Sequence, residues 1–137
     1  MNQKRSAIYR LTYLAPDAQV NHRIGRSTVT IPASAGGIAL PVSATELSER
    51  KDDSGNFVEV ELSARITDTS AASEDRLLSS AFRYGMFILD YTDGTRRLLG
   101  TPQAPVLMTY SKSGVHSAFE LSIKGVTPEF SKQILNK

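Results

Sequence analysis

Asp90 and Asp93 are the first residues to consider for chemistry, because a pair of carboxylates can perform acid–base catalysis when it is buried. Asp93 is followed by Gly94, and an Asp-Gly pair is typical of a hairpin turn, which would use Asp93 for its own geometry. Asp90 falls at the end of the apolar strand before this turn, where we expect it to face water. The spacing therefore favours a turn over a catalytic pair.

Other patterns that bind metals or activate nucleophiles are incomplete in this sequence. The acidic run 52–56 lacks the spaced ligands and closing Glu of a calcium loop, and it reads as a turn. Neither His22 nor His116 has a His or carboxylate at metal-ligand spacing. No serine lies in a nucleophile motif, Gly36-Gly37 lacks the pattern of a phosphate loop, and cysteine is absent. We therefore expect no enzyme activity, no cofactor, no metal and no small-molecule substrate.

Basic residues raise the alternative of nucleic-acid binding, since the sequence pI is about 9.0. One candidate is a stripe made by Arg96 and Arg97 with two arginines from the preceding segment, Arg76 and Arg83. A second candidate places the rings of Tyr9 and Tyr13 near Lys4 and Arg5 as stacking faces. The net charge is only +2, so nucleic acid is a weak expectation, and exposed or paired arginines are the alternative.

Charge is unevenly distributed along the chain. Residues 1–45 hold five bases and one acid, residues 46–75 hold three bases and nine acids, and residues 76–137 hold eight bases and four acids. Such blocks can attract one another between copies of a protein. The alternative is that they intermix within one folded chain.

The segments that must position these residues read mainly as strands. Residues 6–14 alternate and place Tyr9, Leu11 and Tyr13 on one side, and residues 25–31 form a short second strand. A long hairpin follows, with Pro41 on an edge strand, a turn over 51–55 and a return strand over 57–66. In that return strand the inward set comprises Val58, Val60, Leu62, Ala64 and Ile66.

The second half adds one or two helices and four strands. Ser73 can cap a helix that carries Leu77, Leu78, Ala81 and Phe82 on one face and ends at Gly85. A hairpin with a two-residue turn at Asp93-Gly94, strands over 106–110 and 119–124, and a closing helix over 128–135 follow. The prediction for residues 1–137 is one α+β domain, mostly antiparallel β. Its sheet or sandwich has seven to eight strands, with one or two short helices.

Two negative features bear on location. No apolar run approaches the roughly twenty residues of a membrane helix. Residues 6–13 alternate instead of forming the hydrophobic centre of a secretory signal, so we expect no signal peptide and no membrane partner.

Residues 77–135 resemble small uncharacterised proteins of phage-like and mobile elements of Bacteroidetes. The shared pattern is an apolar strand with an Asp-Gly turn (residues 87–94), an apolar-Gly-Thr step (99–101), Pro105 and a final strand pair. The resemblance implies a component of a virion neck, tail or connector, found in the virion or the bacterial cytoplasm. It brings no catalytic residues.

The resulting hypothesis is a structural assembly protein that contacts copies of itself and other particle proteins. The long hairpin would act as a contact arm, and a basic N-terminal tail would dock on a neighbouring copy. The expected contacts are Lys4, Arg5, Lys51, Asp52, Asp53, Asn56, Arg96 and Arg97. The alternative is a ligand-binding β module for peptide, carbohydrate or nucleic acid.

Overall fold

The computed structural model describes residues 7–17, 20, 25–31, 36–113 and 118–135. Lys4 and Arg5 lie outside these residues, as do His22 and His116. The described residues form ten strands and one α-helix, which run in chain order as β1 Ile8–Leu14, β2 Thr28–Val29, β3 Ile38–Pro41, β4 Ser43–Lys51, β5 Val58–Ile66, α1 Ala71–Ser80, β6 Tyr84–Tyr91, β7 Arg96–Leu99, β8 Val106–Ser113, β9 Ala118–Thr127 and β10 Lys132–Ile134.

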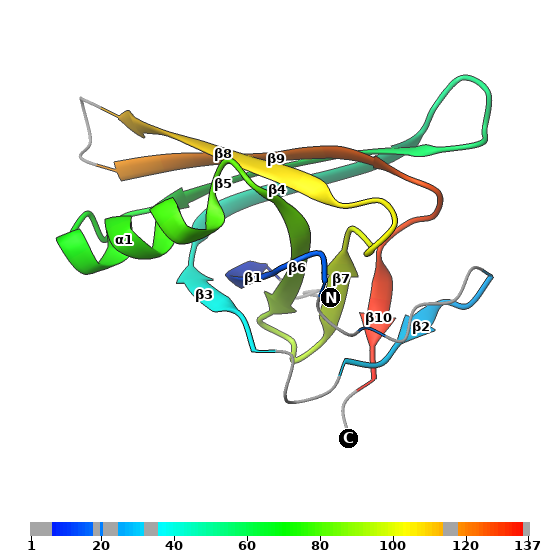
Figure 1. Cartoon of the computed structure of the whole chain (residues 1–137), viewed down its shortest axis with the longest axis horizontal. Helices are drawn as coiled ribbons and strands as arrows, with labels where there is room; N and C mark the ends of the chain where they lie inside the picture. The colour runs from blue at the N-terminus through cyan, green and yellow to red at the C-terminus, as the bar shows by residue number, and fades with distance from the viewer. Residues whose placement is uncertain (1–6, 18–19, 21–24, 32–35, 114–117, 136–137) are drawn as a thin grey trace, which may run out of the picture.

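All ten strands belong to one sheet, which folds over into two layers (Figure 1). Strands β4, β5, β9 and β8 form the upper layer, and β3, β1, β6, β7, β10 and β2 form the lower one. The first residues of β6 pair with β8, whereas the rest of β6 pairs with β1 and β7. Strand β6 therefore carries the hydrogen bonding from one layer into the other.

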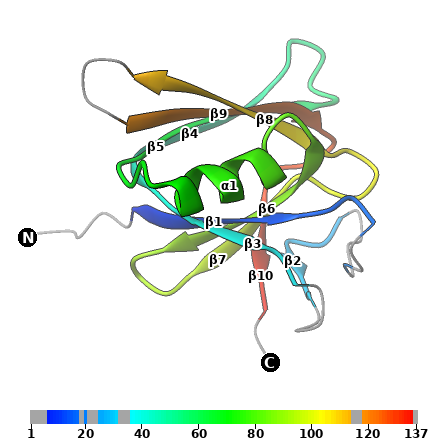
Figure 2. The same cartoon turned by 60° about the vertical axis from the view of Figure 1, so that its left-hand side comes forward.

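The two layers enclose the main core, while α1 covers one open side (Figure 2). The inward residues of β5 are all buried, as their alternation predicts. They pack with Leu11, Phe87, Met108 and Phe119 from both layers. A second, smaller cluster on the far face of the lower layer contains Leu14, Val29, Met86, Ile88, Leu98 and Ile134.

The mainly antiparallel β class with a helical element is confirmed, but the count of seven to eight strands is wrong. Pro41 does lie on an edge, because β3 pairs only with β1 among the described strands. The closing helix expected over 128–135 is replaced by β10, which pairs with β7 and, in parallel, with β2. The local Thr-Pro signal for a helix start is overridden by the unpaired edge of β7.

The helix starts earlier than expected. Its N-cap is Ser70, whose Oγ accepts a hydrogen bond from the Ser73 N–H at 3.3 Å. Leu77 is buried as predicted, but Leu78 and Phe82 are 53% and 60% exposed. The C-cap of α1 is Ala81, and Gly85 lies inside β6.

Two details of the strands also differ from expectation. Tyr9 is 45% exposed, because the register of β1 against β6 shifts between Ile8 and Arg10. The hairpin turn does occur at Asp93-Gly94, but the Tyr91 N–H donates to the Thr95 carbonyl, so residues 92–94 form the loop.

Candidate functional site

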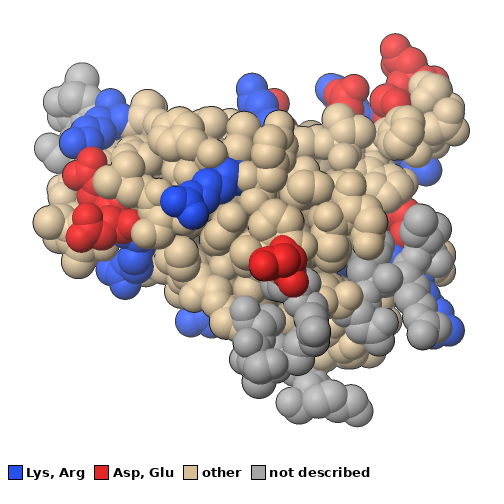
Figure 3. All heavy atoms as spheres, in the orientation of Figure 1, with Lys and Arg blue, Asp and Glu red and all other residues tan. Residues whose placement is uncertain are grey.

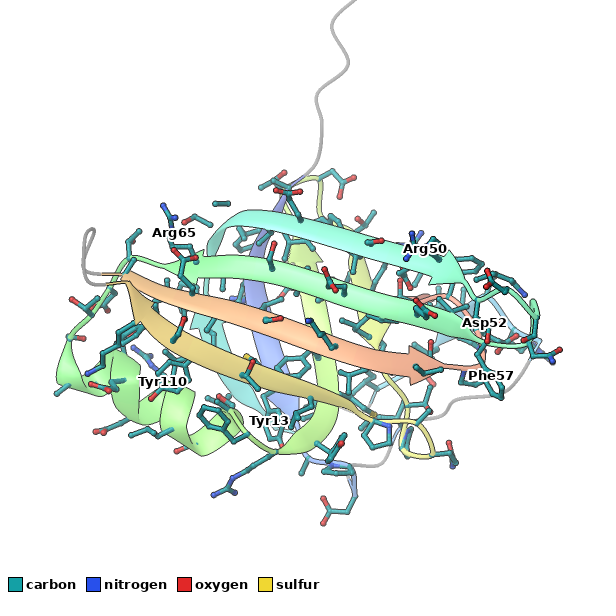
Figure 4. All side chains as sticks on the ribbon, turned by 90° about the horizontal axis from the view of Figure 1, so that it is seen from above. Tyr13, Arg50, Asp52, Phe57, Arg65 and Tyr110 are labelled. Atoms are coloured by element: carbon teal, nitrogen blue, oxygen red, sulfur yellow. The ribbon has the colours of Figure 1, made fainter. Side chains whose placement is uncertain are left out.

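The outward side of the upper layer, which we call the outer face, is formed by β4, β5, β9 and β8. Ladder pairing aligns its residues in rows across the four strands. One row runs from Ser48 through Glu61 and Lys124 to Leu107, which pairs with Tyr84 of β6. The next row holds small hydroxyl residues, namely Ser63, Ser122 and Thr109. Figure 4 looks onto this face from above.

A groove of about 860 Å³ crosses the outer face. Its lining combines apolar with charged side chains that lie next to one another, since Val126 pairs with Glu59 and Leu107 with Lys124. The apolar group is Tyr84, Pro105, Leu107 and Val126, and the charged group is Arg50, Glu59, Glu61 and Lys124. Tyr84 is 59% exposed and Val126 is 53% exposed, so apolar surface is open to a partner. Such a mixture is typical of protein–protein interfaces.

Phe82, two residues before Tyr84, is a strained residue that does not line the groove. Its φ is 60°, a left-handed conformation that costs a residue with a side chain about 1–2 kcal/mol. The backbone N–H of Phe82 donates to the Met108 carbonyl, and its ring lies 5.6 Å from that of Tyr110. The ring nevertheless stays mostly exposed, so the fold gains little burial in return for the strain.

The charges of the outer face pair with one another across the strands. Arg65 and Glu120 approach to 2.9 Å, while Arg50–Glu59 and Lys124–Glu61 are longer at 3.8 and 3.9 Å. These pairs are exposed, so each contributes little to stability. Both signs of charge are also spread over the face shown in Figure 3. Glu61 of the acidic block faces Lys124 of the basic C-terminal block, which shows that the blocks intermix in the fold.

The turn of the long hairpin projects beyond the two layers (Figure 1). Its acid Asp52 is engaged within the turn, where one oxygen accepts hydrogen bonds from Ser54 Oγ at 2.8 Å and from the Phe57 N–H at 3.4 Å. The Ser54 hydroxyl, followed by backbone N–H groups, lowers the pKa of Asp52 below its ordinary value. Asp53 and Asn56 are exposed at the same turn. Of the predicted contacts, Asp52 thus has an internal role.

Arg96 also has an internal role, and the expectation that Asp90 faces water is wrong. The Asp90 side chain is 4% exposed and lies between Arg10 Nε at 2.9 Å and Arg96 Nε at 2.7 Å. The hydrogen bond and charge of Asp90 raise the pKa of Arg10 above its ordinary value. Arg96 therefore does not join Arg97 in a basic stripe. Tyr13 is buried and cannot serve as a stacking face.

Arg97 instead lies beside Lys51, which is 46 positions away in the sequence. Both line a hollow of about 450 Å³ together with Arg26 and residues 128–133. We call this the basic hollow. Sequence reasoning missed Arg26 and Phe130 here, because four separate segments form the hollow.

The outer-face residues Tyr84, Leu107 and Val126 were also missed, although two of them carry a signal. Val126 continues the outward series Glu120, Ser122 and Lys124 of β9, and Leu107 precedes Thr109 in the outward series of β8. An apolar residue in a polar series indicates exposed apolar surface.

The described residues contain no group of three or more His, Cys, Asp or Glu that could hold a metal ion. The one described helix is too short and polar to span a membrane. Comparisons with protein-family models, curated proteins and solved structures gave no match for this chain.

Proposed function

We propose that this chain is a non-enzymatic structural protein that assembles with copies of itself through the outer face. The observation that carries the proposal is the groove, whose exposed Tyr84 and Val126 lie beside charged strands. The resemblance of residues 77–135 supports a place in the neck, tail or connector of a phage-like particle.

Tyr84, whose exposed ring lines the groove, is the anchor of this contact. Aromatic side chains at the centre of interfaces commonly account for much of the binding free energy. In a two-fold contact the same patch of both copies takes part, so a central apolar anchor is buried in each copy.

The test is the molar mass in solution, measured by light scattering after size exclusion over a range of protein concentrations and at low and high salt. We expect a defined multimer whose mass changes little with salt, because the outer-face charges already pair within one chain. Tyr84→Ser should weaken association by more than about tenfold. The control is Tyr9→Ser, which removes an exposed ring from the lower layer.

Phe82→Gly is a second control, because Phe82 does not line the groove. Relief of the left-handed strain offsets the lost contact with Tyr110, so the free energy of unfolding should change by no more than about 1 kcal/mol. Association should stay as in the parent chain. A chain that stays monomeric at every concentration would favour the alternative, a β module that binds peptide or carbohydrate in the groove. Equal effects of Tyr84→Ser and Tyr9→Ser would place the contact elsewhere.

The hairpin turn 51–56, with Lys51, Asp53 and Asn56, is a second proposed contact. Shortening this turn should lower the assembled mass while leaving the sheet intact by circular dichroism. A shortened chain that assembles normally would confine the contact to the outer face.

A further inference from the structure

Four cationic side chains line the basic hollow, and they come from four parts of the chain. Arg26 precedes β2, Lys51 ends β4, Arg97 lies in β7 and Lys132 begins β10. Arg26, Lys51 and Arg97 are exposed, whereas Lys132 is 4% exposed. These three side chains are exposed at one site, where Lys51 Nζ also donates to the Gly55 carbonyl at 3.4 Å.

The acids near the basic hollow are engaged within the protein. Glu129, the acid that lines it, lies 2.8 Å from the buried Lys132 Nζ, and its other oxygen accepts from the Gly25 N–H at 2.9 Å. Glu49, just outside, accepts from the N–H and Oγ of Ser131 at 2.6 and 2.8 Å. Their hydrogen bonds hold these carboxylates against the wall, so the exposed cations dominate what a ligand meets.

An aromatic ring completes the site. Phe130 lines the basic hollow and is 46% exposed. Arg97 is held in place beside it, because its Nη1 donates to the Ser131 carbonyl at 2.9 Å. Exposed cations around an accessible ring are the combination that binds single strands, since phosphates meet the cations and a base stacks on the ring.

We infer that the basic hollow binds single-stranded nucleic acid, with phosphates at Arg26, Lys51 and Arg97 and a base on Phe130. Stacking tolerates every base, so the site selects single strands over duplex without reading sequence. This activity is separable from assembly through the outer face, because the lining of the basic hollow shares no residue with that of the groove. Lys51 also belongs to the proposed hairpin contact, so Arg97→Gln is the variant that tests binding alone.

The test measures binding of the full chain to a fluorescently labelled oligothymidine strand by anisotropy, over a range of salt. Lys51→Gln and Arg97→Gln should each lower the slope of log affinity against log salt by about 0.7. Lys124→Gln removes the same charge from the outer face and should leave the slope unchanged. Tyr84→Ser, measured alongside, should bind as the parent chain does.

Phe130 variants test stacking separately from charge. Phe130→Leu keeps an apolar side chain but removes the ring, and it should weaken binding by about tenfold at an unchanged salt slope. Phe130→Tyr should retain the affinity and shows that the position tolerates exchange. A matching duplex should bind more weakly than the single strand.

Three results would overturn the inference. The first is no binding of the strand at low salt. The second is an equal loss for Lys51→Gln and Lys124→Gln, which would indicate diffuse attraction to the whole surface. The third is an affinity for inorganic phosphate equal to that for the strand, together with no effect of Phe130→Leu on strand binding. That result would indicate a site for anions only.

Discussion

Asp90 is the one carboxylate that the described part of the chain buries almost completely, and two arginines hold it there. Arg10 and Arg96 each remain partly exposed, at 43% and 31% of their side chains, so their charges keep contact with water. Loss of the two arginines would leave the Asp90 carboxylate buried without a charge partner, whereas loss of Asp90 would leave both arginines in contact with water. The carboxylate ties β1 to the β6–β7 hairpin at a point where three strands meet.

Asp90→Asn should therefore lower the free energy of unfolding. The amide cannot accept from both guanidinium groups and leaves one donor facing another, so we expect a loss of about 3 kcal/mol in the free energy of unfolding. Urea titration followed by circular dichroism measures it. The control is Glu120→Gln, which breaks an exposed pair with Arg65 and should cost less than about 1 kcal/mol. Equal costs would show that the Asp90 cluster behaves like a surface ion pair.

The sequence indicates the strand that carries Asp90 but not its burial. A residue next to a turn usually faces water, and the partner Arg10 lies 80 positions away. The same limit applies to Lys51 and Arg97, whose proximity depends on the path of four segments. Local alternation, by contrast, predicts every inward residue of β5, because register in a half-buried strand follows directly from side-chain parity.

At the scale of elements, the crossing of β6 between layers requires glycine at position 85. A Cβ there would lie 2.4 Å from the Tyr13 ring and 2.6 Å from the Leu14 carbonyl. The Tyr13 hydroxyl donates to the Tyr84 carbonyl at 3.0 Å, which holds the ring against the backbone. Position 125 requires glycine for the same reason, since a Cβ there would lie 2.6 Å from Val106 Cγ1 of β8.

Gly85→Ala should destabilise the fold by about 3 kcal/mol, because a backbone atom must move as well as a ring. The thermal midpoint measures this effect. Gly55→Ala is the control: no atom lies within 4 Å of its Cβ, and its φ of 74° should cost only about 1 kcal/mol. A Gly85→Ala chain no less stable than the control would mean that the layers separate easily at this point.

Local sequence patterns for helices and strands differ in how well they predict the structure of the packed chain. The sequence analysis predicts Ser73 as the N-cap, whereas Ser70 caps α1, because either serine can accept from a first-turn N–H. Residues 128–135 carry a good helix start, yet hydrogen bonds to β7 and β2 outweigh it. The hairpin of β6 and β7 was predictable because its turn and both strands adjoin in the sequence.

At the scale of the whole molecule, the two proposed sites lie over different core clusters. The outer face rests on the main core between the layers. The basic hollow is built from residues 25–27 and 128–133, which adjoin the smaller cluster through Val29 and Ile134. The N–H groups of Gln133 and Leu135 donate to the Ser27 and Val29 carbonyls, which joins the two segments.

Ile134→Ala should therefore loosen the basic hollow without unfolding the chain. Removing the side chain leaves a cavity in the smaller cluster and should lower the local opening free energy by about 2 kcal/mol or more. Amide hydrogen exchange should then speed up at Gln133 and Leu135 but remain slow in β5. Nucleic-acid affinity should fall in parallel, while the assembled mass stays constant. Leu62→Ala provides the contrast, since it lies in the main core and should accelerate exchange in both layers. If Ile134→Ala accelerates β5 as much as β10, the clusters unfold together, and both surfaces depend on a single cooperative unit.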